Sequence, residues 1–226
     1  MSLVLHYHPL SSYCWKVLIA LYEKGLAFEA REVNMGDPDA RAAYAELWPT
    51  GKIPLLQDGD RVVPETTIQI EYLDLHHPAQ AQLLPGDAAA QLEVRLWDRL
   101  FDGYVMGGLD LAIGHYHLRP EGQRDPLGLE NAERTLAMAY AMIEARMPGS
   151  TWAVGERFTL ADCAAAPALF YTSIVKPFPE TCPRLAAYFE RLMARPSVAR
   201  CIAEARPYFQ YFPLVAQMPA RFRDAG

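Results

Sequence analysis

The segment from Lys52 to Thr66 constrains the fold of this chain more than any other, because it joins a proline-led apolar run to a helix start. Apolar residues on both sides of Gly59 predict two short strands, at residues 54–57 and 62–64, connected by a tight turn. Proline has no N–H for a sheet ladder, so we expect Pro54 at a sheet edge or at a special bend. The segment therefore predicts a hairpin that needs further strands.

Polar groups along this hairpin favour a bound peptide. A cis Ile53–Pro54 bond would leave the backbone of Ile53 free to pair with an extended peptide. Glu65 and Thr66 begin the next helix, where free N–H groups and the helix dipole favour a carboxylate, and Glu65 offers a charge for an amine. The alternative is a hairpin and a helix cap without a ligand, in which Thr66 and Gln69 form a capping box. That alternative gives Glu65 no role.

The elements before this hairpin predict an α/β domain. Alternation and helical periodicity predict strands at residues 4–7 and 28–33 and helices at residues 15–23 and 38–47. The resulting order is β-α-β-α-β-β-α, and Ser11 and Cys14 stand at the start of the first helix. This arrangement resembles a thioredoxin-like domain, in which the corresponding loop often carries Cys-x-x-Cys opposite a cis-proline.

The second half of the chain predicts only helices. Leu92, Leu96, Leu100 and Val105 suggest an apolar stripe on a long helix, and a polar loop at about residues 119–128 separates it from a helix at 129–146. Thr159 and Asp162 predict a capping box for an apolar helix, which Pro167 should kink. Further helices are expected at residues 183–194 and 197–204. These patterns predict an all-helical domain with one strongly buried helix.

The whole chain resembles the cytosolic-type glutathione transferases. The similarity is carried by Ser11-Ser12-Tyr13-Cys14-Trp15-Lys16-Val17, Gly51-Lys52-Ile53-Pro54-Leu55, Pro64-Glu65-Thr66 with Tyr72-Leu73, and Phe158-Thr159-Leu160-Ala161-Asp162. It implies an α/β plus all-α fold, with a thioredoxin-like glutathione-binding domain at residues 1–78, a linker at 79–86 and a helical bundle that binds the second substrate at 87–226. It also implies a homodimer.

The resemblance assigns roles to residues at the first helix. Ser11 would be the catalytic serine that stabilises the glutathione thiolate, with Ser12 and Cys14 as secondary candidates. The alternative is that both serines only cap the helix. Ser12 is expected to point elsewhere and Cys14 to face the core. The segment from Ser11 to Val17 is also similar to the zeta class, which includes glutathione-dependent isomerases. However, Tyr13 stands where that class has a cysteine, and Lys16 and Leu18 replace its two arginines.

The remaining site residues follow from the same resemblance. Glutathione is expected to contact Ser11, Lys52, Ile53, Pro54, Glu65 and Thr66. The apolar pocket for the second substrate is expected to include Tyr104, Met106, His115 and Tyr208, for which core packing is the alternative.

Composition excludes several other partners. The net charge is −6 and no run of Lys and Arg is present, which disfavours nucleic acid and anionic membranes. No apolar stretch is long enough to cross a bilayer and no signal peptide is evident. The four cysteines are scattered and fit reduced thiols, which favours a cytoplasmic protein. The histidines lack partners at metal-ligand spacing, so no metal is expected.

The sequence therefore predicts a glutathione transferase that conjugates glutathione, its co-substrate, to small apolar electrophiles. Two alternatives remain open. One is a glutathione-dependent isomerase or thiol reductase, and the other is a protein that binds glutathione without turnover, since a fold does not fix a function.

Overall fold

The computed structural model describes residues 3–78, 80–147 and 149–224 and begins with a four-stranded sheet. Its strands are β1 (Leu3–Tyr7), β2 (Phe28–Glu32), β3 (Leu55–Asp58) and β4 (Arg61–Val63), in the order β2-β1-β3-β4. β1 is parallel to β2 and antiparallel to β3, and β3 is antiparallel to β4. The predicted hairpin is confirmed. Of the two positions expected for Pro54, it takes the special bend and not the sheet edge, because it follows a cis peptide bond and directly precedes the central strand β3.

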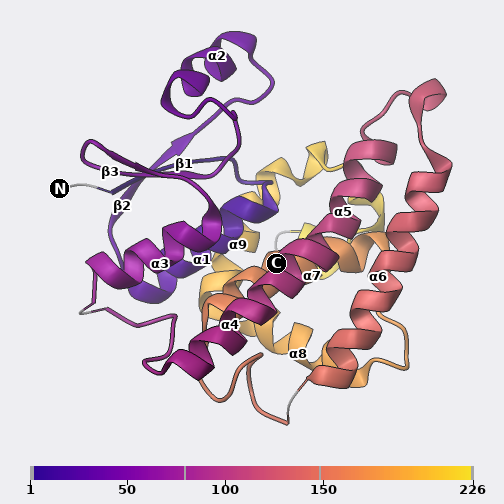
Figure 1. Ribbon diagram of the computed structural model, residues 1–226. Helices are drawn as coiled ribbons and strands as arrows, with labels where there is room; N and C mark the ends of the chain where they lie inside the picture. Colours follow the sequence, from indigo (N-terminus) through magenta and orange to yellow (C-terminus); the bar gives the residue numbers. More distant parts are fainter. Residues whose placement is uncertain (1–2, 79, 148, 225–226) are drawn as a thin grey trace.

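Three helices cover the two faces of this sheet. Figure 1 shows α1 (Ser12–Lys24) and α3 (Thr66–His76) on one face and α2 (Pro38–Leu47) on the other. The α2 face carries a small apolar cluster that includes Val33, Tyr44 and Leu55, whereas α1 belongs to the main core. The predicted order β-α-β-α-β-β-α and the thioredoxin-like domain are thereby confirmed.

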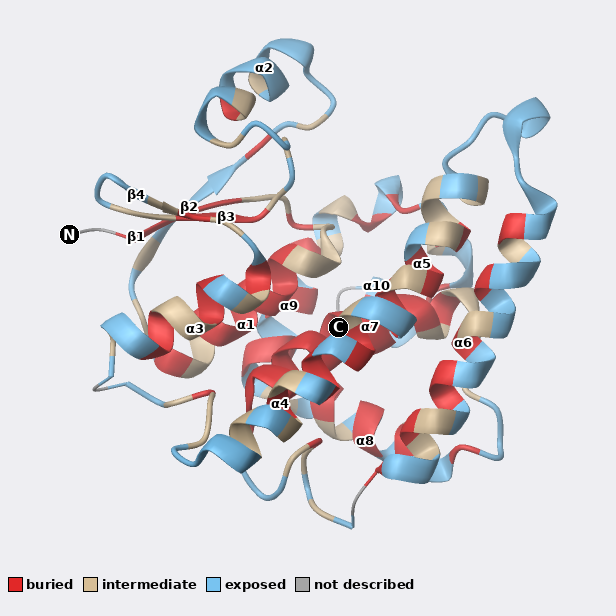
Figure 2. Cartoon of the chain, viewed as in Figure 1, coloured by how far each residue is buried: buried red, intermediate tan, exposed pale blue. Residues whose placement is uncertain are grey.

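Helix α1 joins this domain to the rest of the molecule because it is buried along most of its length (Figure 2). It packs against α3 on one side and against α7 (Leu160–Val175) on the other. Gly25 ends the helix at φ 63°, where its N–H donates to the carbonyls of Leu21 and Tyr22. A residue with a Cβ would be strained in this left-handed conformation. The start of α1 is therefore held from within the core.

The second domain is helical, as predicted. Its α-helices are α4 (Ala88–Leu100), α5 (Met106–Ala112), α6 (Pro126–Arg146), α7, α8 (Pro183–Ala194), α9 (Pro196–Ala205) and α10 (Ala220–Arg223). Two π-helical turns, Phe101–Val105 and Ile113–His117, extend α4 and α5, and short 3-10 turns occur at Glu121–Gln123, Arg206–Tyr211 and Val215–Gln217. Among the described residues, no helix is both long and apolar enough to cross a membrane.

The apolar stripe expected on the first long helix is only partly correct. Leu92 is 69% exposed and Leu96 39% exposed, whereas Val94, Trp97 and Phe101 are buried. The buried positions are three or four residues apart, as one helical face requires, but they are displaced from the predicted stripe. Both faces of this helix are apolar, so periodicity alone could not identify the one that meets the core.

Helix α7 forms the centre of the helical domain and begins with the predicted capping box of Thr159 and Asp162. The buried Asp162 carboxylate accepts hydrogen bonds from the N–H of Ala153, the N–H and hydroxyl of Thr159, and the hydroxyl of Tyr188. The helix continues through Pro167 to Val175. Four donors on one carboxylate fix the start of α7 relative to α8.

One carboxylate fixes the position of the segment that connects the two domains. Asp74 of α3 accepts hydrogen bonds from Lys24 at 2.8 Å and from the N–H groups of Leu83 and Leu84 at 2.8 and 2.7 Å. Residues 80–87 form no helix or strand. The linker at 79–86 stays a prediction, and its first residue lies outside the described residues.

Candidate active site

The loop between β1 and α1 presents the hydroxyl of Ser11. Ser11 is the N-cap of α1, and its Oγ accepts a hydrogen bond from the N–H of Cys14 at 3.3 Å. Its own N–H donates to the carbonyl of His8 at 3.0 Å. A hydroxyl has one proton and two lone pairs, so capping the helix leaves the proton of Ser11 free to donate. Capping and a catalytic role are therefore compatible.

Cys14 faces the core, as expected. Its side chain is fully buried, and its Sγ accepts a hydrogen bond from the N–H of His8 at 3.4 Å. Burial raises the pKa of the Cys14 thiol to about 12, although the nearby Ser11 hydroxyl and the N–H of His8 oppose the shift. A buried thiol whose pKa is raised in this way is a poor nucleophile.

Hydrogen bonds from two side chains hold the predicted peptide-binding edge in place. The Ile53–Pro54 peptide bond is cis. The hydroxyl of Tyr44 donates to the carbonyl of Lys52 at 2.7 Å, and Gln69 Nε2 donates to the carbonyl of Pro54 at 2.9 Å. Gln69 does not complete a capping box with Thr66, because Glu65 is the N-cap of α3 and Gln69 Oε1, the atom that would accept a cap N–H, has no hydrogen-bond partner among the described residues. Within the described part of the chain, the backbone of Ile53 has no backbone partner.

Glu65 has an unusual backbone conformation. Its φ of 66° makes it the one non-glycine residue with positive φ among those described. Such a conformation costs about 1–3 kcal/mol and is found most often at functional sites. Glu65 is exposed, precedes α3 and makes no side-chain capping bond, while Thr66 is buried. No sequence pattern predicts this backbone strain, because only the fold imposes it.

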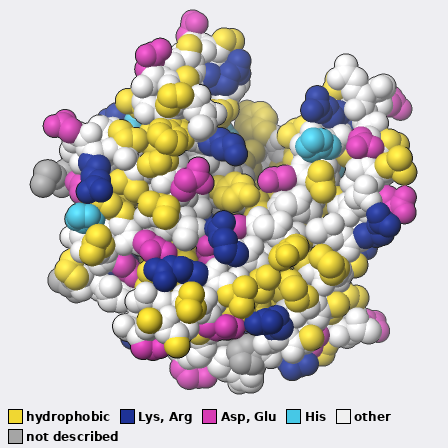
Figure 3. Space-filling view, in the orientation of Figure 1, with side chains coloured by type: hydrophobic (Ala, Val, Ile, Leu, Met, Phe, Trp, Pro, Cys, Tyr) yellow, Lys and Arg dark blue, Asp and Glu magenta, His cyan; other side chains and the backbone are white. Residues whose placement is uncertain are grey.

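A cleft of about 520 Å³ lies beside Ser11. In Figure 3 the surface is hollowed between the N-terminal domain and the end of α5 and α6. The cleft receives residues from four regions, namely the Ser11 loop, α5 with its π-helical turn and the residue after it, α7, and the C-terminal segment: Leu10, Ser11, Ser12, Leu109, Asp110, Ile113, Gly114, His115, Leu118, Tyr171, Tyr211, Phe212 and Pro213. The apolar residues of α5 and of the C-terminal segment thus form a wall of the cleft opposite the N-terminal end of α1.

The sequence predictions for this cleft agree only in part with its lining. His115 lines it, and so does Ser12, which was expected to point elsewhere. Met106 is 2% exposed and belongs to the core, whereas Tyr104 is exposed outside the lining. The hydroxyl of Tyr208 donates to Glu32 at 2.8 Å, which holds Tyr208 against the sheet. The pocket assignments of Met106, Tyr104 and Tyr208 therefore need correction.

Sequence reasoning missed the polar residue of this apolar wall. Asp110 lines the cleft, and burial raises the pKa of its carboxyl, an effect that the charges of Lys52 and His115 oppose. Lys52 belongs to the N-terminal domain and Asp110 to α5, so the two charges interact between the domains. Tyr211 and Phe212 were also missed. These residues share no sequence motif, and only the chain fold brings them to Ser11.

Beneath the Glu65 turn, a buried ionic network connects the domains. Lys16 Nζ lies 2.5 Å from Asp98 Oδ1 and 2.7 Å from Asp102 Oδ2, and it donates to Thr67 Oγ1 at 3.0 Å. Arg99 donates to the same two carboxylates and to Thr67. Lys16 is 1% exposed, so its charge requires these partners. The network fixes the position of α3 relative to α4.

Metal-ligating groups do not gather anywhere in the described structure. No three His, Cys, Asp or Glu side chains among the described residues are close enough together to hold a metal ion.

Comparison with known proteins places this site in a family. Residues 5–81 match the model of the glutathione S-transferase N-terminal domain, and residues 111–196 match that of the C-terminal domain. Glutathione S-transferase 3 of Zea mays is 32% identical over 86% of this chain and 90% of its own length. A glutathione S-transferase of Silene vulgaris is 28% identical over 90% of this chain and 98% of its own. The chain belongs to the glutathione S-transferase family and is a glutathione transferase.

Solved structures agree with this assignment. A glutathione S-transferase from Methylobacillus flagellatus, solved with GSH bound, is 29% identical, with a TM-score of 0.80 over 88% of this chain and 98% of that one. Another, from Methylobacterium radiotolerans in complex with glutathione sulfonate, is 30% identical, with a TM-score of 0.75 over 89% and 94% of the two chains.

Proposed function

We propose that this enzyme conjugates glutathione to small apolar electrophiles in the cleft beside Ser11. The observation that carries the proposal is that one cleft combines a free hydroxyl at a helix N-terminus with an apolar wall from another domain. Glutathione would pair with the backbone of Ile53, with Lys52 and Pro54 beside it, and Glu65 and Thr66 would hold its γ-glutamyl end. Its sulfur would then lie at Ser11.

Ser11 would act by stabilising the thiolate of glutathione. A thiol with a pKa near 8.5 is only about 3% ionised at pH 7, and lowering that pKa by two units requires about 2.7 kcal/mol. The hydroxyl of Ser11 and the first N–H groups of α1, which have no partner within the helix, can supply this stabilisation together. The remaining acceleration would come from holding the thiolate against the electrophile.

The electrophile would bind against Leu109, Ile113, Tyr211 and Phe212. This wall is mainly apolar, and its aromatic rings favour flat, apolar substrates. The buried neutral thiol of Cys14 favours conjugation over thiol–disulfide exchange at that residue. For the isomerase alternative, the second arginine of the zeta pattern is missing, because the buried Leu18 of α1 stands in its place.

We also propose a homodimer formed by the exposed apolar face of α3 and α4. Ile68 and Leu75 on α3 are 53% and 73% exposed, and they belong to the N-terminal domain, whereas the exposed Leu92 and Leu96 belong to the helical domain. A two-fold axis here would place the N-terminal domain of one subunit against the helical domain of the other. Wild-type protein should sediment as a dimer at micromolar concentration, and Leu75→Glu with Leu92→Glu should give monomers. A monomeric wild type would contradict this proposal.

The proposed activity is tested by two measurements on the same preparation. Calorimetric titration should give one glutathione site per chain, and conjugation of chlorodinitrobenzene should depend on both substrates. Glutathione binding without conjugation of any apolar electrophile would instead support the non-catalytic alternative. A mixed disulfide with glutathione trapped at Cys14, together with loss of activity in Cys14→Ala, would support a thiol reductase.

A further inference from the structure

His8, directly after β1, makes three hydrogen bonds with the loop and helix that carry Ser11. The N–H of Leu10 donates to His8 Nδ1 at 3.2 Å, and the N–H of Ser11 donates to the carbonyl of His8 at 3.0 Å. The N–H of His8 in turn donates to Cys14 Sγ at 3.4 Å. Pro9, the residue between His8 and Leu10, has no N–H to donate. Both N–H groups of the loop as far as Ser11 are therefore bonded to His8.

The hydrogen bond from Leu10 defines the protonation of the His8 ring. A ring nitrogen that accepts a hydrogen bond carries no proton, so the neutral ring has its proton on Nε2. Burial lowers the pKa of His8, which favours the neutral ring, although the charge of Glu32 opposes the shift. Nε2 lies 3.9 Å from Glu32 Oε1, so the carboxylate favours a proton on that nitrogen. Glu32 therefore supports the ring form that Leu10 requires.

The same carboxylate connects His8 to the C-terminal segment. Glu32 Oε2 accepts a hydrogen bond from the hydroxyl of Tyr208 at 2.8 Å. The rings of His8 and Tyr208 meet edge to face, with their centroids 5.6 Å apart at an interplanar angle of 75°. The His8 ring is thus held between the Ser11 loop, β2 and the C-terminal segment.

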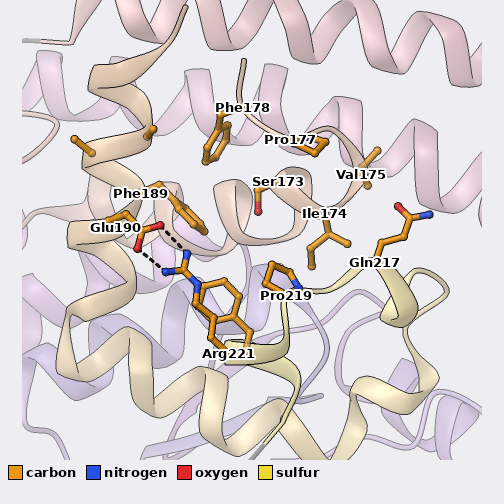
Figure 4. A pocket seen from close by; sticks show the side chains of 13 residues that line it. Ser173, Ile174, Val175, Pro177, Phe178, Phe189, Glu190, Gln217, Pro219 and Arg221 are labelled. Carbon is orange, nitrogen blue, oxygen red and sulfur yellow. Dashed lines mark hydrogen bonds and ion pairs between the residues drawn. The ribbon is translucent and has the colours of Figure 1, made fainter. Parts of the chain in front are cut away.

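The C-terminal segment is held at two points along its length. Tyr208 provides the first, at β2 of the N-terminal domain. Arg221 provides the second, because it donates two hydrogen bonds to the Glu190 carboxylate of α8, at 2.8 and 2.6 Å, as the dashed lines in Figure 4 show. Tyr211 and Phe212, which line the cleft, lie between these two points in the sequence. Of the two contacts, the one at Tyr208 places this segment against the Ser11 loop.

We propose, on the basis of the thiolate-stabilising role proposed for Ser11, that His8 is a positioning residue: its neutral ring holds the loop that orients the Ser11 hydroxyl, and Glu32 and Tyr208 fix the ring. His8 does not line the cleft, so it acts through Ser11 and not on the substrates. Without an acceptor for Leu10 the loop would shift, and a displacement of about 1 Å can cost roughly a hundredfold in rate.

Two substitutions of equal shape test the hydrogen bond from Leu10. In His8→Asn the side-chain oxygen can accept the N–H two residues on, as in an Asx turn, whereas His8→Leu has no acceptor. His8→Leu should lower kcat roughly tenfold and raise the pKa of the bound glutathione thiol, measured by thiolate absorbance against pH. His8→Asn should recover most of both quantities. The Kd of glutathione should change less than twofold in either variant, which also shows that each is folded, and His76→Gln, at an exposed position of α3, is the control.

The absorbance measurement needs no electrophile, so it separates two kinds of failure. If Ser11→Ala leaves the thiol pKa unchanged, the role proposed for Ser11 is wrong and His8 has nothing to position. If Ser11→Ala raises that pKa but His8→Leu and His8→Asn give equal values, only the role of His8 is wrong.

A double-mutant cycle tests the contribution of Tyr208. Tyr208→Phe keeps the ring and removes the hydroxyl that holds Glu32, so it should raise the thiol pKa in the same direction as His8→Leu, by a smaller amount. In the His8→Leu background it should add nothing, because the ring that Glu32 orients is absent. An equal shift from Tyr208→Phe in both backgrounds, or none in the wild type, would overturn the role of Glu32 and Tyr208 in fixing the ring.

Discussion

The two walls of the cleft are built in different ways. On the N-terminal side the cleft is lined by the Ser11 loop, and the neighbouring Lys52–Pro54 loop, where we propose that glutathione binds, is held by hydrogen bonds from Tyr44 and Gln69. The helical wall consists of side chains such as Ile113, His115 and Tyr211, which extend from π-helical and 3-10 turns. The first wall is fixed by hydrogen bonds, whereas the second is held mainly by packing.

This difference suggests that the two walls have different roles in substrate binding. A ligand that is always the same favours a wall whose donors and acceptors are fixed, because each lost hydrogen bond is costly. An apolar wall loses only part of its binding energy when one side chain changes, so it can accept different electrophiles. Substitutions in the N-terminal wall should therefore have large effects on any substrate, and those in the helical wall should have smaller, substrate-dependent effects.

The largest effect is expected for Ser11→Ala. Removing one oriented donor should lower kcat by roughly ten- to a thousandfold and raise the pKa of the bound glutathione thiol. Thiolate absorbance measured against pH on the bound enzyme gives that pKa directly. Cys14→Ala and Ser12→Ala are the matched controls and should cost much less. If Ser12→Ala lowers kcat as much as Ser11→Ala does, the assignment of the catalytic role to Ser11 alone is wrong. The comparison is informative because both serines line the cleft.

A smaller effect is expected for Glu65→Ala, which should raise the Kd of glutathione about thirtyfold, or about 2 kcal/mol. The side chain is exposed in the structure, so its charge pair with an amine would be desolvated only when the ligand binds. Calorimetry on the wild type, Glu65→Ala and Asp60→Ala, an exposed acid at the hairpin turn, makes the comparison. Equal affinities in all three would remove Glu65 from the site.

The helical wall should respond more weakly. Ile113→Ala removes apolar contact area from the cleft and should raise the KM for an apolar electrophile about tenfold, while the Kd of glutathione stays unchanged. Leu127→Ala, at an exposed position of α6, should leave both values unchanged. A parallel loss of glutathione affinity in Ile113→Ala would mean that the two walls do not act separately.

The same contrast explains how much of the site was predictable. Ser11, Ile53 and Glu65 lie in short continuous motifs of the thioredoxin-like half, where turn chemistry and spacing determine local structure. Asp110 and Tyr211 lie far apart in the sequence and meet only through the packing of helices. The π-helical turn Phe101–Val105 displaces the residues after it from a regular helical period, and Met106, predicted in the pocket, lies in the core. Burial of Lys16 could not be predicted either, because its partners Asp98 and Asp102 come from the other domain.

The smallest effect is expected at the contact that holds the two domains together at the far end of α1. Glu23 accepts hydrogen bonds from Arg195 at 2.9 and 2.6 Å and from Ser197 at 2.5 Å, so it connects α1 to the start of α9. Burial opposes ionisation, but these hydrogen bonds and the charge of Arg195 outweigh it and lower the pKa of the Glu23 carboxyl below its ordinary 4.5.

A carboxyl whose pKa is lower in the folded state stabilises the fold above the unfolded-state pKa, and this contribution is lost as the pH falls through the folded-state pKa. The free energy of unfolding should therefore decrease below pH 4.5 in the wild type, and less so in Glu23→Gln. At pH 7 the variant should be less stable by about 1 kcal/mol, since Arg195 is one-third exposed and solvent weakens the pair. Urea unfolding at several pH values measures both quantities, and Glu29→Gln, whose pair with Arg31 is half exposed, should change neither. If Glu23→Gln keeps the pH dependence of the wild type, carboxylates other than Glu23 must fix the relative position of the two domains, and therefore of the two walls of the cleft.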